Sequence, residues 1–138
     1  MSRVGPEEAV PSIAVVGSLN IDLIAYTARV PGAGETVIGD RFQMGFGGKG
    51  ANQAVMSARL GARVSMVGAL GDDVYADMTR RNLAAQDVDA THVARVAGSS
   101  GVAPIWVEPD GTNRISSAVG TIRLKSSATS TSRDKHVP

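Results

Sequence analysis

Cysteine is absent from this 138-residue sequence, and aromatic residues make up only 4% of it. The lack of cysteine excludes a disulfide framework and a thiolate metal site, and it suits the reducing cytoplasm, where we expect the protein to act. No segment approaches the roughly 20 continuous apolar residues that span a bilayer. Residues 1–11 carry charges in place of the apolar run of a secretory signal, so we expect a disordered lead-in and no membrane partner.

Charge is also scarce, with a formal net charge of +1 and 20% charged residues. No basic stripe is present, which excludes nucleic acid as a partner. His92 has no acidic or second histidine neighbour and His136 stands in the tail, so neither predicts a metal ligand or a general base. The 43% hydrophobic content suffices for the core of one domain. We expect the partner to be a small molecule or another protein.

Short apolar runs alternate with segments of helical periodicity. Residues 13–16 form one run, which ends at Gly17, and residues 63–67 form another; both are typical of strands covered on both faces. Residues 51–60 and 74–86 have the spacing of amphipathic helices. Because parallel strands need a crossover, and the crossover is usually a helix, this alternation predicts an α/β fold with a parallel sheet.

Three further segments have β character. Residues 36–43 are β-branched and alternating, which predicts a peripheral strand. Residues 100–107 and 112–115 flank the turn signal Glu108-Pro109-Asp110-Gly111, which predicts an antiparallel hairpin. Pro104 lies inside the first arm of that hairpin and favours an edge position for it.

A glycine cluster, Gly45-Phe46-Gly47-Gly48-Lys49-Gly50, stands directly before the first predicted helix. Glycines let backbone N–H groups approach a ligand, and a helix start adds unpaired donors and the positive end of the helix dipole. Lys49 adds a charge, and Asn52 offers both a donor and an acceptor to a polyol. The loop therefore suits phosphates or sugar hydroxyls. A purely structural tight loop is the alternative, but it leaves Asn52 unexplained.

Two nucleotide-binding motifs can be compared with this cluster. A Walker loop needs a glycine six residues before the lysine and Ser or Thr after it, whereas Gln43 and Gly50 occupy those places. The dinucleotide fingerprint is matched by Gly45-x-Gly47-x-x-Gly50, with aspartates about 20 residues further on. That fingerprint belongs after the first strand of its unit, and the best first strand here ends far upstream. A dinucleotide-dependent oxidoreductase stays open as an alternative.

Three segments share an order and spacing that can be compared with a known family. They are Val16-Gly17-Ser18-Leu19-Asn20-Ile21-Asp22, Pro31-Gly32-Ala33-Gly34-Glu35-Thr36 and Gly45-Phe46-Gly47-Gly48-Lys49-Gly50-Ala51-Asn52-Gln53-Ala54. Together they resemble the ribokinase branch of the phosphofructokinase-B-type carbohydrate kinases, and the resemblance covers residues 12–115. Lys49 with Asn52 and Gln53 favours the ribokinase branch over the fructokinase and adenosine kinase branches.

The resemblance implies a ribokinase-like three-layer α/β/α sheet, incomplete here, with a small β lid formed by residues 36–43 and 100–115. It implies ATP-dependent phosphorylation of ribose at the 5-hydroxyl, with ATP and Mg²⁺ as cofactors, to which a monovalent cation could be added. It also implies a homodimer through the lid. The sugar-binding residues that it implies are Asn20, Asp22, Gly47, Gly48, Lys49 and Asn52.

Asn20 and Asp22 take their expected role from this resemblance. Asp22 would accept hydrogen bonds from two neighbouring sugar hydroxyls, and ionised acceptors make the stronger bonds. For an arbitrary Asn-x-Asp, an Asx-turn or a helix cap is the more common role. The spacing to Asn52, which matches the family, favours the sugar.

The catalytic base of the resembled family has no counterpart in the 138 residues. Phosphoryl transfer needs such a base, which in that family is the aspartate of a Gly-Ala-Gly-Asp motif, so no catalytic residue is assigned. Gly32-Ala33-Gly34-Glu35 resembles the motif only superficially, because it ends in glutamate and precedes the lid.

Residues 116–138 are rich in Ser and Thr, and we expect a disordered or non-homologous tail there. A family-like part, residues 12–115, joined to such a tail predicts a truncated chain that is poorly soluble and inactive alone. The alternative from the binding class is a non-catalytic fragment that binds a sugar or dimerises through its lid.

Overall fold

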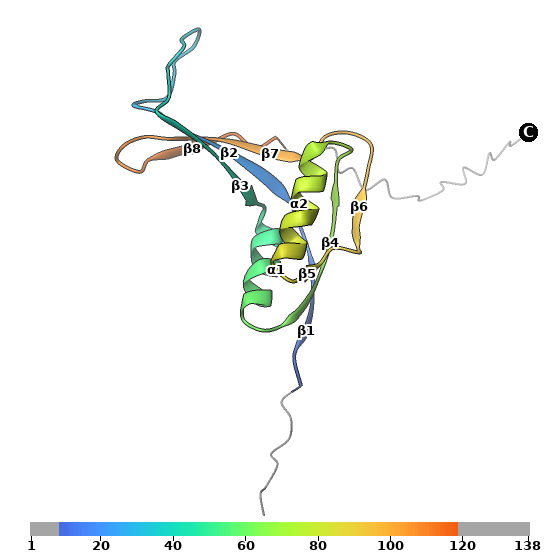
Figure 1. Ribbon diagram of the computed structural model, residues 1–138. Helices are drawn as coiled ribbons and strands as arrows, with labels where there is room; N and C mark the ends of the chain where they lie inside the picture. Colours follow the sequence, from blue (N-terminus) through green and yellow to red (C-terminus); the bar gives the residue numbers. More distant parts are fainter. Residues whose placement is uncertain (1–8, 119–138) are drawn as a thin grey trace, which may run out of the picture.

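The computed structural model describes residues 9–118, whose strands form two sheets (Figure 1). The base sheet consists of β1 (Ser12–Val16), β4 (Arg63–Leu70), β5 (Val88–Asp89) and β6 (Val93–Arg95). The lid sheet consists of β2 (Asn20–Tyr26), β3 (Arg41–Gly47), β7 (Gly101–Val107) and β8 (Asn113–Ile115). The helices are α1 (Lys49–Arg59) and α2 (Val74–Ala85). Most of the expected lead-in, residues 1–8, and most of the expected tail, residues 119–138, lie outside the described residues.

The base sheet is parallel throughout. β1 pairs with β4 from Ser12 opposite Arg63 to Val16 opposite Val67, and β5 and β6 each pair with β4 in the same sense. Along the chain α1 precedes β4, and α2 connects β4 to β5. The helices therefore provide the crossovers that parallel neighbours require. The predicted α/β class is confirmed.

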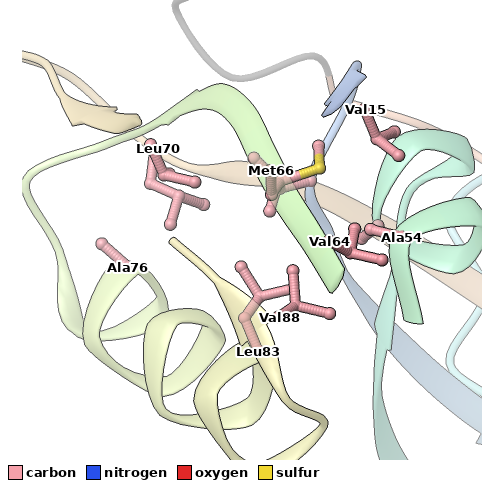
Figure 2. Packing of buried hydrophobic residues seen from close by; sticks show 11 residues of the cluster. Val15, Ala54, Val64, Met66, Leu70, Ala76, Leu83 and Val88 are labelled. Carbon is pink, nitrogen blue, oxygen red and sulfur yellow. The ribbon is translucent and has the colours of Figure 1, made fainter. Parts of the chain in front are cut away.

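Both helices pack on one face of the base sheet (Figure 2). Val64 and Met66 of β4 lie on that face, because residues two apart in a strand point the same way. They join one buried cluster with Ala54 of α1 and Leu83 of α2, both of which are 0% exposed. Full burial of an aliphatic side chain contributes about 1.5–3 kcal/mol, so this cluster is the main source of stability in the base. Residues 9–118 thus contain the sheet and one helical layer of the expected three-layer arrangement.

The opposite face of the base sheet carries no helix within the described residues. The prediction that residues 13–16 are covered on both faces is wrong for this part of the chain, since only Val15 of β1 is buried and Val16 is 78% exposed. Among these residues β1 has one neighbouring strand, β4, which leaves its other edge open. Open edges and exposed apolar side chains favour aggregation, so the expected poor solubility stays a prediction.

The lid sheet has the order β3-β2-β7-β8 and contains a strand that the sequence pattern missed. β2 pairs antiparallel with β3 and parallel with β7. The sequence pattern predicted no strand at β2, where Asn20 and Asp22 interrupt the apolar residues. The expected strand at residues 36–43 is displaced, since ladder pairing starts only where Arg41 faces Tyr26. The small β lid itself is present.

The predicted hairpin is confirmed, but the predicted edge position of Pro104 is wrong. β7 lies between β2 and β8 in the lid sheet, and the backbone nitrogen of Gly111 donates to the Glu108 carbonyl in the turn at 2.9 Å. The Pro104 carbonyl accepts from the Ser116 nitrogen at 3.0 Å, on the β8 side. The missing N–H of Pro104 therefore faces the short β8, which ends at Ile115, where one lost ladder bond is tolerated.

Candidate functional site

The loop after β1 packs directly against the start of α1. A Cβ atom on Gly50 would lie 2.7 Å from the Cα atom of Gly17, a distance that real Cβ contacts do not reach. The Ala51 nitrogen also donates to the Ser18 carbonyl at 3.1 Å. Glycine at both positions therefore brings the beginning of β2 next to the first turn of α1.

Asn20 and Asp22 lie on one face of the lid, because they are two residues apart on β2. Asn20 stands between Gly47 of β3 and Gly101 of β7 in the ladder. A Cβ atom on Gly47 would lie 2.6 Å from Oδ1 of Asp22, and one on Gly101 would overlap Oδ1 of Asn20. The two glycines thus leave the space in which the polar side chains extend across the neighbouring strands.

Gly48 forms the corner between β3 and α1. Its φ of 95° lies in the region that favours glycine, and a Cβ atom there would lie 2.5 Å from the Ser18 carbonyl oxygen. α1 has no side-chain N-cap and no acidic residue in its first turn, so the positive end of its dipole is not compensated. Lys49 and Asn52 are exposed in that same turn. The corner therefore presents donors and positive charge to a polar ligand.

A cavity of about 430 Å³ lies between the lid and the start of α1. Its lining residues are Ser18, Asn20, Gly48, Lys49, Asn52, Ala103, Ile115 and Ser117. Four of the six residues predicted to bind sugar are therefore brought together around one cavity. Asp22 and Gly47 do not line it. They contact each other across the neighbouring lid strands β2 and β3.

The other lining residues were not predicted. Ala103 faces Asp22 in the ladder between β7 and β2. Its place beside the site could therefore be predicted only if β2 were first recognised as a strand. Ile115 and Ser117 come from the end of the hairpin. Ser18 lies two residues before Asn20, and its carbonyl accepts from the Ala51 nitrogen of α1.

Burial raises the pKa of Asp22 above its ordinary value of 3.8, since partial removal from water disfavours the charged carboxylate. The carboxylate lies over Gly47, and no cation is found among the causes of the shift. A partly buried carboxylate without a cationic partner is stabilised in its charged form when hydrogen-bond donors bind to it. Sugar hydroxyls are donors of the required kind.

This shift gives the stability of the chain a pH dependence that Asp22→Asn removes. The folded chain keeps the Asp22 proton to a higher pH than the unfolded chain, so its free energy of unfolding falls as the pH rises through the raised pKa. The stability of the Asp22→Asn variant relative to wild type should therefore increase as the pH rises above about 4. Urea denaturation at a series of pH values measures this difference. A difference that stays constant across the range contradicts the assignment.

Glu35, the last residue of the superficial Gly-Ala-Gly-Glu match, holds a turn. It pairs with Arg29 and accepts from the Gly32 nitrogen at 3.0 Å. These bonds, the one from Arg29 first, lower the pKa of Glu35 to about 2. A carboxylate that binds its proton so weakly is unsuited to accept one from a sugar hydroxyl near neutral pH, which agrees with leaving it out of the chemistry.

Residues 9–118 contain no cluster of three or more acidic, histidine or cysteine side chains that could hold a metal ion. The same residues include no helix with the length and apolarity to cross a membrane.

Comparison with known proteins places this geometry in a family. The sequence matches the pfkB family carbohydrate kinases over residues 10–134. The chain belongs to this family. A deoxyribokinase of Salmonella typhi is 49% identical over 104 residues, which are 75% of this chain and 34% of that protein. A ribokinase of Bacillus subtilis is 48% identical over 105 residues, which are 75% of this chain and 36% of that protein.

Solved structures of ribokinases share the fold of this chain. The Arabidopsis thaliana ribokinase complexed with ribose and ATP superposes with a TM-score of 0.74 at 34% identity, over 81% of this chain and 37% of that one. A ribokinase from Cryptococcus neoformans in complex with ADP gives a TM-score of 0.70 at 32% identity, over 80% of this chain and 35% of that one. The predicted ribokinase-like fold, incomplete here, is confirmed. The chain spans about a third of the length of these relatives.

The glycine spacing that suggested a dinucleotide site has a different setting in the pfkB fold. Gly45 and Gly47 belong to β3, an antiparallel strand of the lid, and Gly50 lies in α1. The dinucleotide fingerprint requires the turn after the first strand of a parallel unit. This geometry and the family membership argue against an oxidoreductase.

Proposed function

We propose that the described residues form the sugar side of a ribokinase-type kinase, which transfers the γ-phosphoryl group of ATP to the 5-hydroxyl of ribose. The observation that carries the proposal is the cavity that Asn20, Gly48, Lys49 and Asn52 share. Amide, backbone and ammonium donors meet there, and the Asp22 carboxylate lies on the adjoining face. A polyol needs both donors and acceptors, and this site supplies both.

The lid provides the cover of the proposed sugar site. β7 contributes Ala103 to the cavity, and the hairpin contributes Ile115. These small or apolar side chains exclude water without competing for hydroxyls, which strengthens the polar contacts beneath them. Ribokinases are among the relatives, and a ribokinase that was solved with ribose shares the fold.

A second pentose, 2-deoxyribose, is favoured by a specific observation, since a deoxyribokinase is 49% identical over the matched part. The two sugars differ by one hydroxyl. A site that hydrogen-bonds the 2-hydroxyl discriminates strongly against the sugar that lacks it, because its own polar groups are then left unpaired. Asp22, as an acceptor for two neighbouring hydroxyls, would provide this discrimination.

The remaining chemistry of the proposed reaction is not assigned to residues 9–118. We propose that the catalytic aspartate and the ATP and Mg²⁺ sites belong to the part of the kinase fold that lies beyond these residues. The division into residues 1–11, 12–115 and 116–138 stays a proposal, as do cytoplasmic action and the inactivity of the chain alone.

We also propose that two copies dimerise through the lid. Ile38 is 91% exposed, Phe42 of β3 is 66% exposed, and Ile115 of β8 is 59% exposed. Phe42 and Ile115 belong to the two edge strands of the lid sheet, and Ile38 lies in the loop just before β3. Large exposed apolar side chains at such places are suited to contact with another chain. The dimer would cover them.

Calorimetric titration of the full chain with ribose and with 2-deoxyribose tests the proposed sugar. We expect ribose to bind and 2-deoxyribose to bind at least about tenfold more weakly, a difference of about 1.4 kcal/mol. Stronger binding of 2-deoxyribose than of ribose would contradict ribose as the substrate and indicate the deoxy sugar in its place. NAD serves as the control ligand, and binding of NAD without either sugar would contradict the proposal.

A further inference from the structure

Asp73 makes more hydrogen bonds than capping a helix requires. Its Oδ1 atom accepts from the Ala76 nitrogen at 3.0 Å, which is the ordinary N-cap bond of α2. The same oxygen accepts from the Ser100 hydroxyl at 2.8 Å, and its Oδ2 atom accepts from the Ser100 nitrogen at 2.7 Å. One carboxylate therefore joins the start of α2 to a residue 27 positions further along the chain.

Ser100 completes this connection. It is 4% exposed, and its hydroxyl oxygen accepts from the Gly71 nitrogen at 3.0 Å. A Cβ atom on Gly71 would overlap the backbone of residues 98–100, so the two segments are in direct contact. We call the set Gly71, Asp73 and Ser100 the clasp. It fastens the loop after β4 to the residue that directly precedes β7.

The clasp lies at the point where the lid leaves the base. Ser100 is followed by Gly101, the first residue of β7, which stands beside Asn20 in the ladder. Two residues later Ala103 lines the cavity. The rise of a strand is about 3.3 Å per residue, so the clasp is within about 10 Å of the cavity wall along β7. A shift of Ser100 would move this wall relative to Lys49 and Asn52 of α1.

We infer that Asp73 and Ser100 are positioning residues, which hold the lid at the distance from α1 that the proposed sugar site requires. The part of this inference that concerns sugar rests on the proposed function. A simple N-cap would need only the bond to Ala76, whereas both carboxylate oxygens are used and Ser100 is buried to reach them. The carboxylate and the hydroxyl thus connect the base to the lid.

Asp73→Ser separates capping from clasping. Serine is a strong N-cap residue, so α2 keeps its cap, but its single hydroxyl cannot make the two bonds to Ser100. Ser100→Ala is the complementary variant, since it leaves the Asp73 cap intact and removes the hydroxyl. Far-UV circular dichroism checks that both variants fold.

Pulsed electron paramagnetic resonance measures the position of the lid directly. The sequence has no cysteine, so labels on Ala84→Cys in α2 and Asn113→Cys in β8, both exposed residues, have no background. We expect one narrow distance distribution in the chain with the native clasp and a broad one with Asp73→Ser. In the unlabelled chain, Asp73→Ser should also weaken ribose binding by about tenfold.

A distance distribution as narrow as the native one in a folded Asp73→Ser variant would overturn the inference. The two readouts also separate the inference from the proposed function. If the native chain binds no ribose, the proposed sugar site fails, while the distance distribution still tests the clasp. If ribose binds the native chain and Asp73→Ser equally, the clasp does not position the site.

Discussion

Replacing Asp22 with alanine should weaken ribose binding by about 100-fold, or about 2.8 kcal/mol, while the chain stays folded. Hydrogen bonds to a charged acceptor contribute about 1.5–3 kcal/mol each, and Asp22 is proposed to accept two from neighbouring hydroxyls. The folding prediction has a separate reason. Burial raises the pKa of Asp22, so its charged form is less favourable in the folded chain than in water, and its removal costs the fold little.

Asp40→Ala is the matched control for Asp22→Ala. Asp40 is another aspartate of the lid region, directly before β3, but it is exposed and lies beside Tyr26, at the end of β2 opposite to Asn20. Calorimetric titration should give the native ribose affinity for Asp40→Ala and the reduced affinity for Asp22→Ala, with thermal melts that stay near wild type for both. Equal affinities of the two variants would remove Asp22 from the proposed site.

Replacing Gly48 with alanine should destabilise the chain by about 3 kcal/mol or more, because two costs combine. The φ of 95° places an alanine in a strained backbone region, at about 1–2 kcal/mol. Its Cβ atom would also meet the Ser18 carbonyl oxygen at 2.5 Å and the Cα atom of Leu19 at 2.9 Å. Relief of these contacts requires α1 to move away from the start of β2, which opens the proposed sugar site.

Gly61→Ala separates the two costs. Gly61 has a similar φ of 91°, but nothing lies within 4 Å of a Cβ atom built there. Urea denaturation should therefore show a loss of about 1–2 kcal/mol for Gly61→Ala and a clearly larger loss for Gly48→Ala. Ribose affinity should fall in Gly48→Ala and stay unchanged in Gly61→Ala. Equal losses for both would mean that the contact with Ser18 and Leu19 does not constrain the corner.

The main elements of the base were predictable from sequence because their signals are local, whereas the short strands β5 and β6 were not predicted. β1, β4, α1 and α2 follow from apolar periodicity, and each predicted boundary lies within three residues of the observed one. The helix starts and stops also have local causes, such as the Asp73 cap of α2. Periodicity does not report what covers a strand, so the exposure of Val16 could not be foreseen.

The lid was harder to predict because its contacts are distant in sequence. Asn20 pairs with Gly101 across the ladder, and no local pattern reports such a pairing. β2 was also difficult to predict because Asn20 and Asp22 occupy positions where a buried strand would carry apolar side chains. The predicted binding residues around Gly48 were found through the glycine loop and the family resemblance. Ala103 and Ile115 were missed because small and apolar residues carry no chemical signal.

Ribose titration of the ¹⁵N-labelled full chain, followed by amide NMR, tests the central claim most directly. The claim is that Asn20, Asp22 and the corner from Gly47 to Asn52 form one sugar site. We predict saturable shifts of the amides of these residues and of Ala103, with the amides at the C-terminal end of α2 unchanged. Saturable shifts that avoid the corner, or no shifts at any ribose concentration, would contradict this account.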